Sequence, residues 1–486
     1  MSTRYDAVVV GSGPNGLTAA VLLARQGLRV RVLEAEPDAG GGLRTRPLTL
    51  PGYQHDLCSA IHPTAVLSPV FGALGLEVEW APFSTSIGHP IDERRSVVSH
   101  RSLDAAADAL GRDGAAYRRL VAPFVTCDLF EDVLAPPLRV PRHPLLFARF
   151  GLTGLRSARS LAQRFATPEA RALIAGCAAH SILPLEAAGT AAMALVFLAS
   201  THLVDWPCVR GGSGALAAAL VNALLRAGGE IELGRRVTSL DELPPHRVAL
   251  FDTSPRALSA IAGHALPART HRAFQRYRYG PGVFKVDFAL EAPIPWRHEG
   301  LAEASTVHVG GTFEEVADSE RAMWAGPTDR EHTERPFLIV CQQSHQDSTR
   351  APPGRHTGYA YCHVPAGSTA DHLPAVMAQL ERHAPGFSSR VLATRVSGPA
   401  ALEAENANLI GGAIAGGATT LAQVFARPTL RLDPYRTPNP RIFLCSASTP
   451  PGGGVHGMCG YWAARSALRA LGVKGDLGAP RRAALR

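Results

Sequence analysis

The chain has 486 residues, and 46% of them are hydrophobic, which is enough for a large core in two or three domains. Its net charge of +8 comes from basic residues spread along the whole chain without a recognition motif, so we expect no nucleic-acid partner. The eight cysteines stand at wide intervals with no CxxC pair, which argues against a disulfide framework, a metal site and a disulfide reductase mechanism.

The first predicted element is an apolar strand at residues 5–10, and because it begins so early we expect no cleaved secretion signal. A glycine-rich turn follows at residues 11–16, and then a helix that reaches Gly27. This order is typical of dinucleotide binding, because the glycines let the backbone approach a pyrophosphate at the helix N-terminus. The alternative is a glycine turn that binds no ligand.

The second predicted strand, residues 28–33, ends on Glu34. A carboxylate at this position binds a ribose hydroxyl and disfavours the 2'-phosphate of NADP, which leaves NAD or FAD. A second glycine turn at residues 40–42 leads to Arg44. Only the longer FAD needs this added support for its ribityl chain and flavin, so the sequence favours FAD.

Residues 139–164 form the densest basic patch, in which arginines are mixed with leucines and phenylalanines. This composition is typical of a solvated helix face, or of a membrane-surface face through which an apolar substrate enters. The longest uncharged stretches, 187–201 and 406–426, are too short or too rich in glycine to span a bilayer. We therefore expect a cytoplasmic protein, with peripheral membrane contact through residues 139–164 as an option.

Residues 211–214 look like another dinucleotide turn, but the segment 206–210 before them does not have the pattern of a buried strand. We predict a helix at 216–226 and a strand at 230–237 instead. Without a second complete fingerprint no NAD(P)H site is expected, so the electron acceptor would be dioxygen or a quinone-like molecule.

The C-terminal part repeats the order of strand, glycine turn and helix, at residues 441–445, 451–460 and 462–471. A helix N-terminus stabilises nearby negative charge. Because the turn at 11–16 already suits the pyrophosphate, we expect this second turn to serve the flavin ring. His456 within it is the first catalytic candidate, with a capping role as the alternative.

These motifs, with residues 59–63, 206–207, 284–287 and 307–311, resemble the FAD-dependent phytoene (carotenoid) desaturase-like oxidoreductases over nearly the whole chain. Within that group the pyridine nucleotide-disulfide oxidoreductase domain proteins are the most similar. The resemblance implies an α/β fold of the flavin amine oxidase type, in which a Rossmann-like FAD-binding domain is interleaved with an α+β substrate domain. The implied FAD-binding domain comprises residues 1–70, 204–261 and 435–475, the substrate domain comprises 71–203 and 262–434, and a basic tail follows at 476–486.

The resemblance also implies non-covalent FAD, with Glu34 on the adenosine ribose, Arg44 at the phosphates or flavin edge and Val237 on the adenine. The N-terminal amides of the last helix would face the flavin ring. The implied FAD-binding residues are Gly11, Ser12, Gly13, Pro14, Gly16, Glu34, Ala35, Gly41, Gly42, Arg44, Val237, Ser446, Gly454, Val455, His456, Gly457 and Met458.

Two further features bear on the reaction. Flavin amine oxidases have an acid near the C-terminal strand, whereas this chain has Ala447, as carotenoid desaturases do. Lys285 stands where amine oxidases carry a lysine near flavin N5, or else it is an exposed lysine. His62 is a third catalytic candidate, whereas His180 and His308 are expected to be structural.

The implied activity is dehydrogenation of a hydrophobic or extended small molecule, with a hydride passing to flavin N5 and a proton to a nearby base or water. Three alternatives remain open: an amine oxidase, a saturase or isomerase that uses reduced flavin, and a non-catalytic FAD-binding interaction protein. The sequence predicts neither the substrate nor the oligomeric state.

Overall fold

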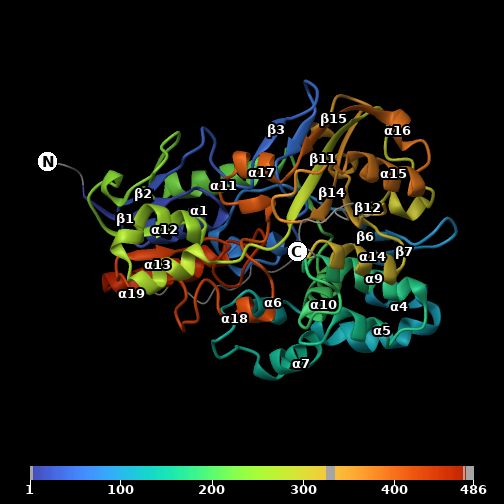
Figure 1. Ribbon diagram of the computed structural model, residues 1–486, viewed down its shortest axis with the longest axis horizontal. Coiled ribbons are helices and arrows are strands. Elements are labelled where there is room, and N and C mark those ends of the chain that lie inside the picture. Colours follow the sequence, from blue (N-terminus) through green and yellow to red (C-terminus); the bar gives the residue numbers. More distant parts are fainter. Residues whose placement is uncertain (1–3, 325–333, 474–476, 478–486) are drawn as a thin grey trace.

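The computed structural model describes residues 4–324, 334–473 and 477. The basic tail predicted at 476–486 lies outside the described residues, apart from Leu477. Two main sheets lie in different halves of the molecule along its long axis, with helices around them (Figure 1).

The first sheet contains five parallel strands in the order β16-β10-β1-β2-β9. Its strands are β1 (Tyr5–Val10), β2 (Val30–Leu33), β9 (Glu230–Glu232), β10 (His246–Phe251) and β16 (Ile442–Leu444). Segments from both ends and the middle of the chain therefore meet in one sheet (Figure 1).

Both faces of this sheet are covered, as expected for an all-parallel sheet. Ala7 and Val9 pack with α1 (Pro14–Ala24), α11 (Ser213–Arg226) and α19 (Met458–Leu471), whereas Val8 and Val10 pack with α12 (Pro255–Ala262) and α13 (Ala268–Gln275). Helices α1 and α19 approach so closely that a Cβ on Gly460 would lie 1.9 Å from the Asn15 carbonyl oxygen. Glycine at this position therefore brings the C-terminal helix against the N-terminal one.

The second sheet contains seven strands in the order β15-β11-β14-β13-β12-β6-β7, antiparallel except for the pair β12 and β6. Its strands are β6 (Thr85–Pro90), β7 (Ser96–His100), β11 (Gly282–Leu290), β12 (Ala304–Val309), β13 (Leu338–Cys341), β14 (His356–Val364) and β15 (Val391–Ser397).

The two faces of this sheet have different surroundings, because one face packs into a hydrophobic core and the other lines a cavity. Lys285, Tyr361, Ile339 and His308 are direct neighbours across four adjacent strands, and therefore share one face. The alternate residues, such as Val286, point to the other face and pack with α15 (Leu373–His383). Polar side chains thus gather on the face away from that core.

The remaining elements complete the molecule around the two sheets. The other helices are α2 (Pro63–Val66), α3 (Pro69–Leu74), α4 (Leu103–Ala109), α5 (Gly114–Val121), α6 (Cys127–Val133), α7 (Pro144–Gly154), α8 (Ala158–Ala162), α9 (Pro168–Ala179), α10 (Thr190–Thr201), α14 (Phe313–Ala322), α16 (Phe387–Arg390), α17 (Pro399–Glu405) and α18 (Leu421–Phe425). Two small sheets pair β3 (Thr45–Pro47) with β4 (Gln54–Asp56) and β5 (Trp80–Ala81) with β8 (Cys208–Val209). No helix within the described residues is long and apolar enough to cross a bilayer.

The elements predicted at both glycine turns are present, with some shifted ends. The interpretation of residues 206–210 was wrong, because Cys208–Val209 form a short buried strand that pairs with β5. The strand predicted at 230–237 ends at Glu232, and Gly234, with φ +68°, turns the backbone soon after it. The final helix begins at Met458, four residues before the predicted start at 462. The proposed domain boundaries stay a prediction.

Candidate functional site

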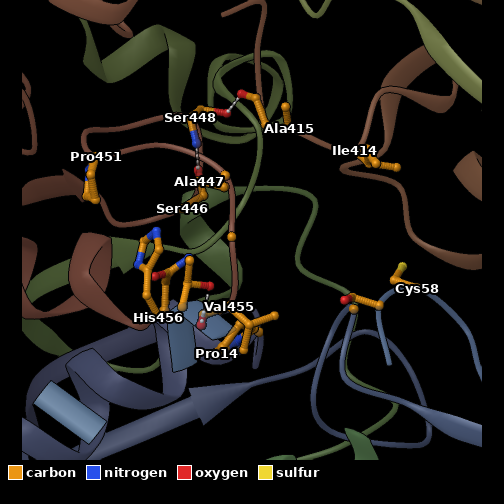
Figure 2. Close-up of a pocket in the computed structure, with 18 of the residues that line it drawn as sticks. Pro14, Cys58, Ile414, Ala415, Ser446, Ala447, Ser448, Pro451, Val455 and His456 are labelled. Carbon is orange, nitrogen blue, oxygen red and sulfur yellow. Dashed lines mark hydrogen bonds between the residues drawn. The ribbon is translucent and has the colours of Figure 1, made fainter. Parts of the chain in front are cut away.

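A cavity of about 1010 Å³ extends between the two sheets. Its wall includes the turn at residues 11–15, the C-terminal turn at 453–456, one face of the second sheet, and apolar residues of α7, α10 and α18. Figure 2 shows a part of this wall in which Pro14 lies beside Val455 and His456, whereas Cys58 lies apart from them across the pocket. The two glycine turns therefore line the same cavity.

The N-terminal turn has the shape that a dinucleotide requires. A Cβ on Gly13 would lie 2.5 Å from Oδ2 of Asp252, and a Cβ on Gly16 would lie 2.4 Å from the Gly11 carbonyl oxygen. Glycine is therefore needed at these positions to keep the backbone at the start of α1 close to the cavity. Gly16 itself lies behind the wall, where its N–H donates to Asp252 at 2.8 Å.

Asp252 is a site residue that the sequence analysis missed. It follows β10 directly and lines the cavity beside the turn at residues 11–15. Burial raises the pKa of this carboxyl to about 7, and the charge of Glu34 adds to the effect. The sequence did contain a signal for this residue, which is an acid directly after an apolar strand. Because the carboxyl ends of parallel strands meet at one edge of a sheet, such an acid is expected near the turn that follows β1.

Glu34 and Arg44 both line the cavity next to the first turn. Glu34 follows β2 and accepts hydrogen bonds from the backbone N–H and the hydroxyl of Ser12, the former at 2.8 Å. Arg44 is 4% exposed and donates from Nε to the Gly41 carbonyl at 2.8 Å. Its Nη1 lies 3.7 Å from Oε2 of Glu36 and has no hydrogen-bond partner among the described residues, so a donor is available at this end of the cavity.

His456 lies in the C-terminal turn and is buried. Its Nδ1 accepts a hydrogen bond from the backbone N–H of Met458 at 3.0 Å, so the neutral ring carries its proton on Nε2. Burial lowers the pKa of His456 to about 4. The hydroxyl of Ser68 donates to the His456 carbonyl at 2.6 Å. These contacts fix the turn and engage the first amide of α19.

Lys285 is buried in the second sheet, so its interpretation as an exposed lysine was wrong. Its Nζ donates to Asp287 and to the Asp56 carbonyl, the latter at 2.9 Å, and lies 4.6 Å from the centre of the Tyr359 ring. The charge of Lys285 is thus held by an ion pair next to the cavity. Sequence spacing alone did not reveal this partner.

His62, the third catalytic candidate, also lines the cavity. The hydroxyl of Ser213 donates to the Ser59 carbonyl at 2.6 Å, so His62 Nε2 is the donor in its 2.8 Å contact with Ser213. Burial lowers the pKa of His62 to about 4, which keeps the ring neutral at pH 7. His180 and His308 contact each other through their Nε2 atoms at 2.9 Å, and His180 also lines the cavity.

The structure brings most of the residues predicted to bind the cofactor to this one wall. The predicted residues that line the cavity are Gly11, Ser12, Gly13, Pro14, Glu34, Ala35, Gly41, Gly42, Arg44, Val237, Ser446, Gly454, Val455 and His456. Gly16 and Met458 do not line it, and their amides are engaged by Asp252 and His456. Gly457, which also lies outside the wall, has φ +66° and precedes α19. The residues missed at the sequence level include Asp252, Tyr359, Tyr361 and His363.

Comparisons with known proteins agree with this geometry. The family described as flavin containing amine oxidoreductase matches residues 15–470. The chain is 25% identical to pyridine nucleotide-disulfide oxidoreductase domain-containing protein 2 of Mus musculus, over 97% of this chain and 94% of that protein. It is 24% identical to the lycopene-forming phytoene desaturase of a Paracoccus species, over 52% of each. A solved structure of putrescine oxidase bound to putrescine has a TM-score of 0.62 at 18% identity, covering 97% of this chain and 100% of that one, which shows a shared fold.

Proposed function

The chain belongs to the flavin-containing amine oxidoreductase family and is an FAD-dependent oxidoreductase, and we propose that it dehydrogenates a hydrophobic small molecule. When bound, FAD would supply the redox chemistry, as the acceptor of a hydride from the substrate and the source of electrons for dioxygen or a quinone-like acceptor. The observation that carries the proposal is the cavity itself, because it joins the dinucleotide turn to a wall of apolar side chains.

We assign the adenosine end of FAD to the first sheet and the flavin end to the C-terminal turn. Glu34 would bind the ribose, Val237 would contact the adenine, and the backbone of Gly13 with the N-terminus of α1 would hold the pyrophosphate. Cys459, three residues after the part of the C-terminal turn that lines the cavity, is buried against the Thr449 and Gly452 carbonyls. This contact supports binding of FAD without a thioether to that residue.

We assign mainly positioning roles to the three catalytic candidates predicted from the sequence. Lys285 keeps a fixed positive charge at the cavity through Asp287. We assign His456 a positioning role, because its Nδ1 caps α19 and cannot accept a substrate proton while that bond exists. Neutral His62 holds Ser213, at the start of α11.

The substrate end of the cavity is apolar, which favours a hydrophobic substrate and the exclusion of water. Its wall includes Phe147, Phe150, Met193, Val196, Phe197 and Val424. The similarity to a phytoene desaturase supports the same substrate class.

Peripheral contact with an anionic membrane belongs to the same proposal. Leu145 and Leu152 on α7 are 87% and 78% exposed, and Leu430 and Leu432 beyond α18 are 70% and 86% exposed. Exposed arginines accompany them, including Arg149 and Arg431. Both helices also line the cavity, and they lie near each other in Figure 1. An apolar substrate could thus pass from lipid into the cavity without crossing water.

The first test is to purify the chain and record its absorption spectrum. We expect the two visible bands of oxidised flavin, and we expect anaerobic addition of a substrate from a panel of apolar alcohols, amines and polyenes to bleach them. A colourless protein that cannot be reconstituted with FAD would contradict the proposal. A flavoprotein that no apolar compound reduces would contradict the substrate class.

A further inference from the structure

Strand β14 presents three ring side chains in a row to the cavity. Tyr359, Tyr361 and His363 alternate along the strand and therefore lie on the same face of the sheet. The ring centres of Tyr361 and His363 are 5.9 Å apart, and those of Tyr359 and Tyr361 are 6.3 Å apart. Lys285 on β11 is directly opposite Tyr361, and its Nζ lies 4.6 Å from the centre of the Tyr359 ring, so the row runs from the Lys285 ion pair to His363.

His363 is oriented by a buried carboxylate on another element. Its Nδ1 lies 2.8 Å from Oε1 and 2.9 Å from Oε2 of Glu320, which is carried by α14. His363 is 4% exposed and Glu320 is 1% exposed. Among the described residues, no lysine or arginine forms an ion pair with Glu320. The carboxylate thus has the imidazole as its ionisable partner.

The opposite edge of the His363 ring is unpaired. Its Nε2 is buried and has no hydrogen-bond partner among the described residues. Because Nδ1 donates its proton to Glu320, Nε2 of the neutral ring is a hydrogen-bond acceptor. Burial removes the water that would bond to it, and no protein group among the described residues takes the place of that water. A buried polar atom in this state, on a residue that lines the cavity, indicates a ligand group with an N–H or O–H donor.

Glu320 can stabilise positive charge on the ring during the reaction. Its carboxylate lies 2.8 Å from Nδ1, so the charge that develops while Nε2 takes a proton from a substrate is next to an acceptor of opposite charge. The facing titratable groups are Tyr361 on β14 and His180 at the end of α9, and burial lowers the pKa of His180 to about 3. His180 is therefore neutral and does not compete for the proton.

We propose that Nε2 of His363 accepts a hydrogen bond from a hydroxyl or amino group of the substrate and takes that proton during dehydrogenation. The O–H or N–H bond breaks, its electron pair becomes the second bond between carbon and the heteroatom, the hydride of that carbon leaves to FAD, and the proton stays on Nε2. The inference rests on the proposed function and narrows its substrate class to apolar alcohols or amines.

A pair of isomeric ligands tests the hydrogen bond directly. Octan-1-ol and 1-methoxyheptane have the same atoms, but only the alcohol has a donor. The ratio of their affinities for the FAD-loaded protein is measured by calorimetry, in the wild type and in His363→Leu. We expect the ratio to shift against the alcohol by about fivefold in the variant, the value of one hydrogen bond. An unchanged ratio, or no detectable binding of either compound to the wild type, overturns the inference.

Octan-1-amine provides the second arm of the same experiment. If the amine binds more tightly than the ether and loses this advantage in His363→Leu, while the alcohol does not, the head group is an amine. The converse result assigns an alcohol. His383→Leu is the matched control, because His383 is also buried with an unpaired Nε2 but lies outside the cavity wall. It should keep the wild-type ratios.

Nitrogen NMR of histidine-labelled FAD-loaded protein gives a readout that does not depend on turnover. The pair of ring signals lost in His363→Gln should show an unprotonated Nε2 that shifts when octan-1-ol is added. A protonated Nε2 in the resting protein would contradict the inference. Failure of the proposed function is distinguishable, since it would appear as a flavoprotein that no apolar compound of the panel reduces.

Discussion

Asp252 is the residue whose charge bears most directly on cofactor binding. Its carboxyl contacts the Gly16 amide beside the proposed pyrophosphate site, and the pKa of about 7 arises first from burial and then from Glu34. A pyrophosphate nearby would favour the neutral acid further. The complex therefore holds a proton that the free protein loses as the pH rises through about 7.

We expect the affinity for FAD to fall as the pH rises above about 7, by at most about tenfold per pH unit. Asp252→Asn should remove most of this dependence, because the amide cannot ionise. Quenching of FAD fluorescence on titration with apoprotein, at about pH 6 and about pH 8, measures both proteins. Equal pH dependence in the two would show that another group is responsible.

Lys285 and Asp287 form a buried ion pair, and removing either partner alone should lower the free energy of unfolding. Lys285→Met leaves the Asp287 carboxylate without its cation, and we expect a loss of about 3–5 kcal/mol of unfolding free energy. Adding Asp287→Asn removes the stranded charge and should recover a large part of that loss. Urea denaturation of the two single variants and the double variant measures the coupling. Additive losses would mean that the pair is not the main role of Lys285.

At the scale of elements, α7 and the segment after α18 determine how the molecule meets a membrane. Replacing Leu145 and Leu152 together by aspartate removes apolar area and adds negative charge on one helix. We expect binding to vesicles of phosphatidylglycerol and phosphatidylcholine to weaken by about tenfold or more. Co-sedimentation with the vesicles measures this effect.

The matched control is Leu225→Asp on α11, because Leu225 is 51% exposed but belongs to the helix that packs on the first sheet. It should bind vesicles like the wild type. A wild-type protein that does not bind these vesicles would leave α7 as a solvated face, the other interpretation of the basic patch.

The strands that form the site differ in whether their role can be recognised from neighbouring residues in the sequence. The turn at 11–16 follows its strand directly, so strand, turn and helix could be predicted together. In contrast, β14 carries Tyr361 and His363, yet its sequence shows no motif that distinguishes a cavity-lining strand. Their importance follows from the register with β11 and from the contact with α14.

For the whole molecule, FAD should act as a link between the two sheets. Its proposed site takes residues from the N-terminal, middle and C-terminal segments, and the cavity wall includes both sheets. Saturation at about 100 times the dissociation constant should stabilise the fold by about 2.7 kcal/mol. Calorimetry should then show one unfolding transition that moves to higher temperature with FAD. Two transitions, of which FAD shifts only one, would contradict this coupling.

The sequence by itself determined the parts of the site that are local along the chain. Both glycine turns, Glu34 after the second strand and the choice of FAD depend on residues close together, because turn geometry and helix N-termini are short-range properties. The family resemblance extended these motifs to the α/β fold.

Only the tertiary structure decided which distant groups meet. Asp252 contacts Gly16 across 236 positions, and His363 meets Glu320 across 43. Lys285 was visible in the sequence, but its burial against Asp287 and Tyr359 was not. The physical reason is that strand order and register determine which side chains become neighbours. The residues adjacent to a side chain in the sequence do not indicate which charged group will lie next to it in the folded core.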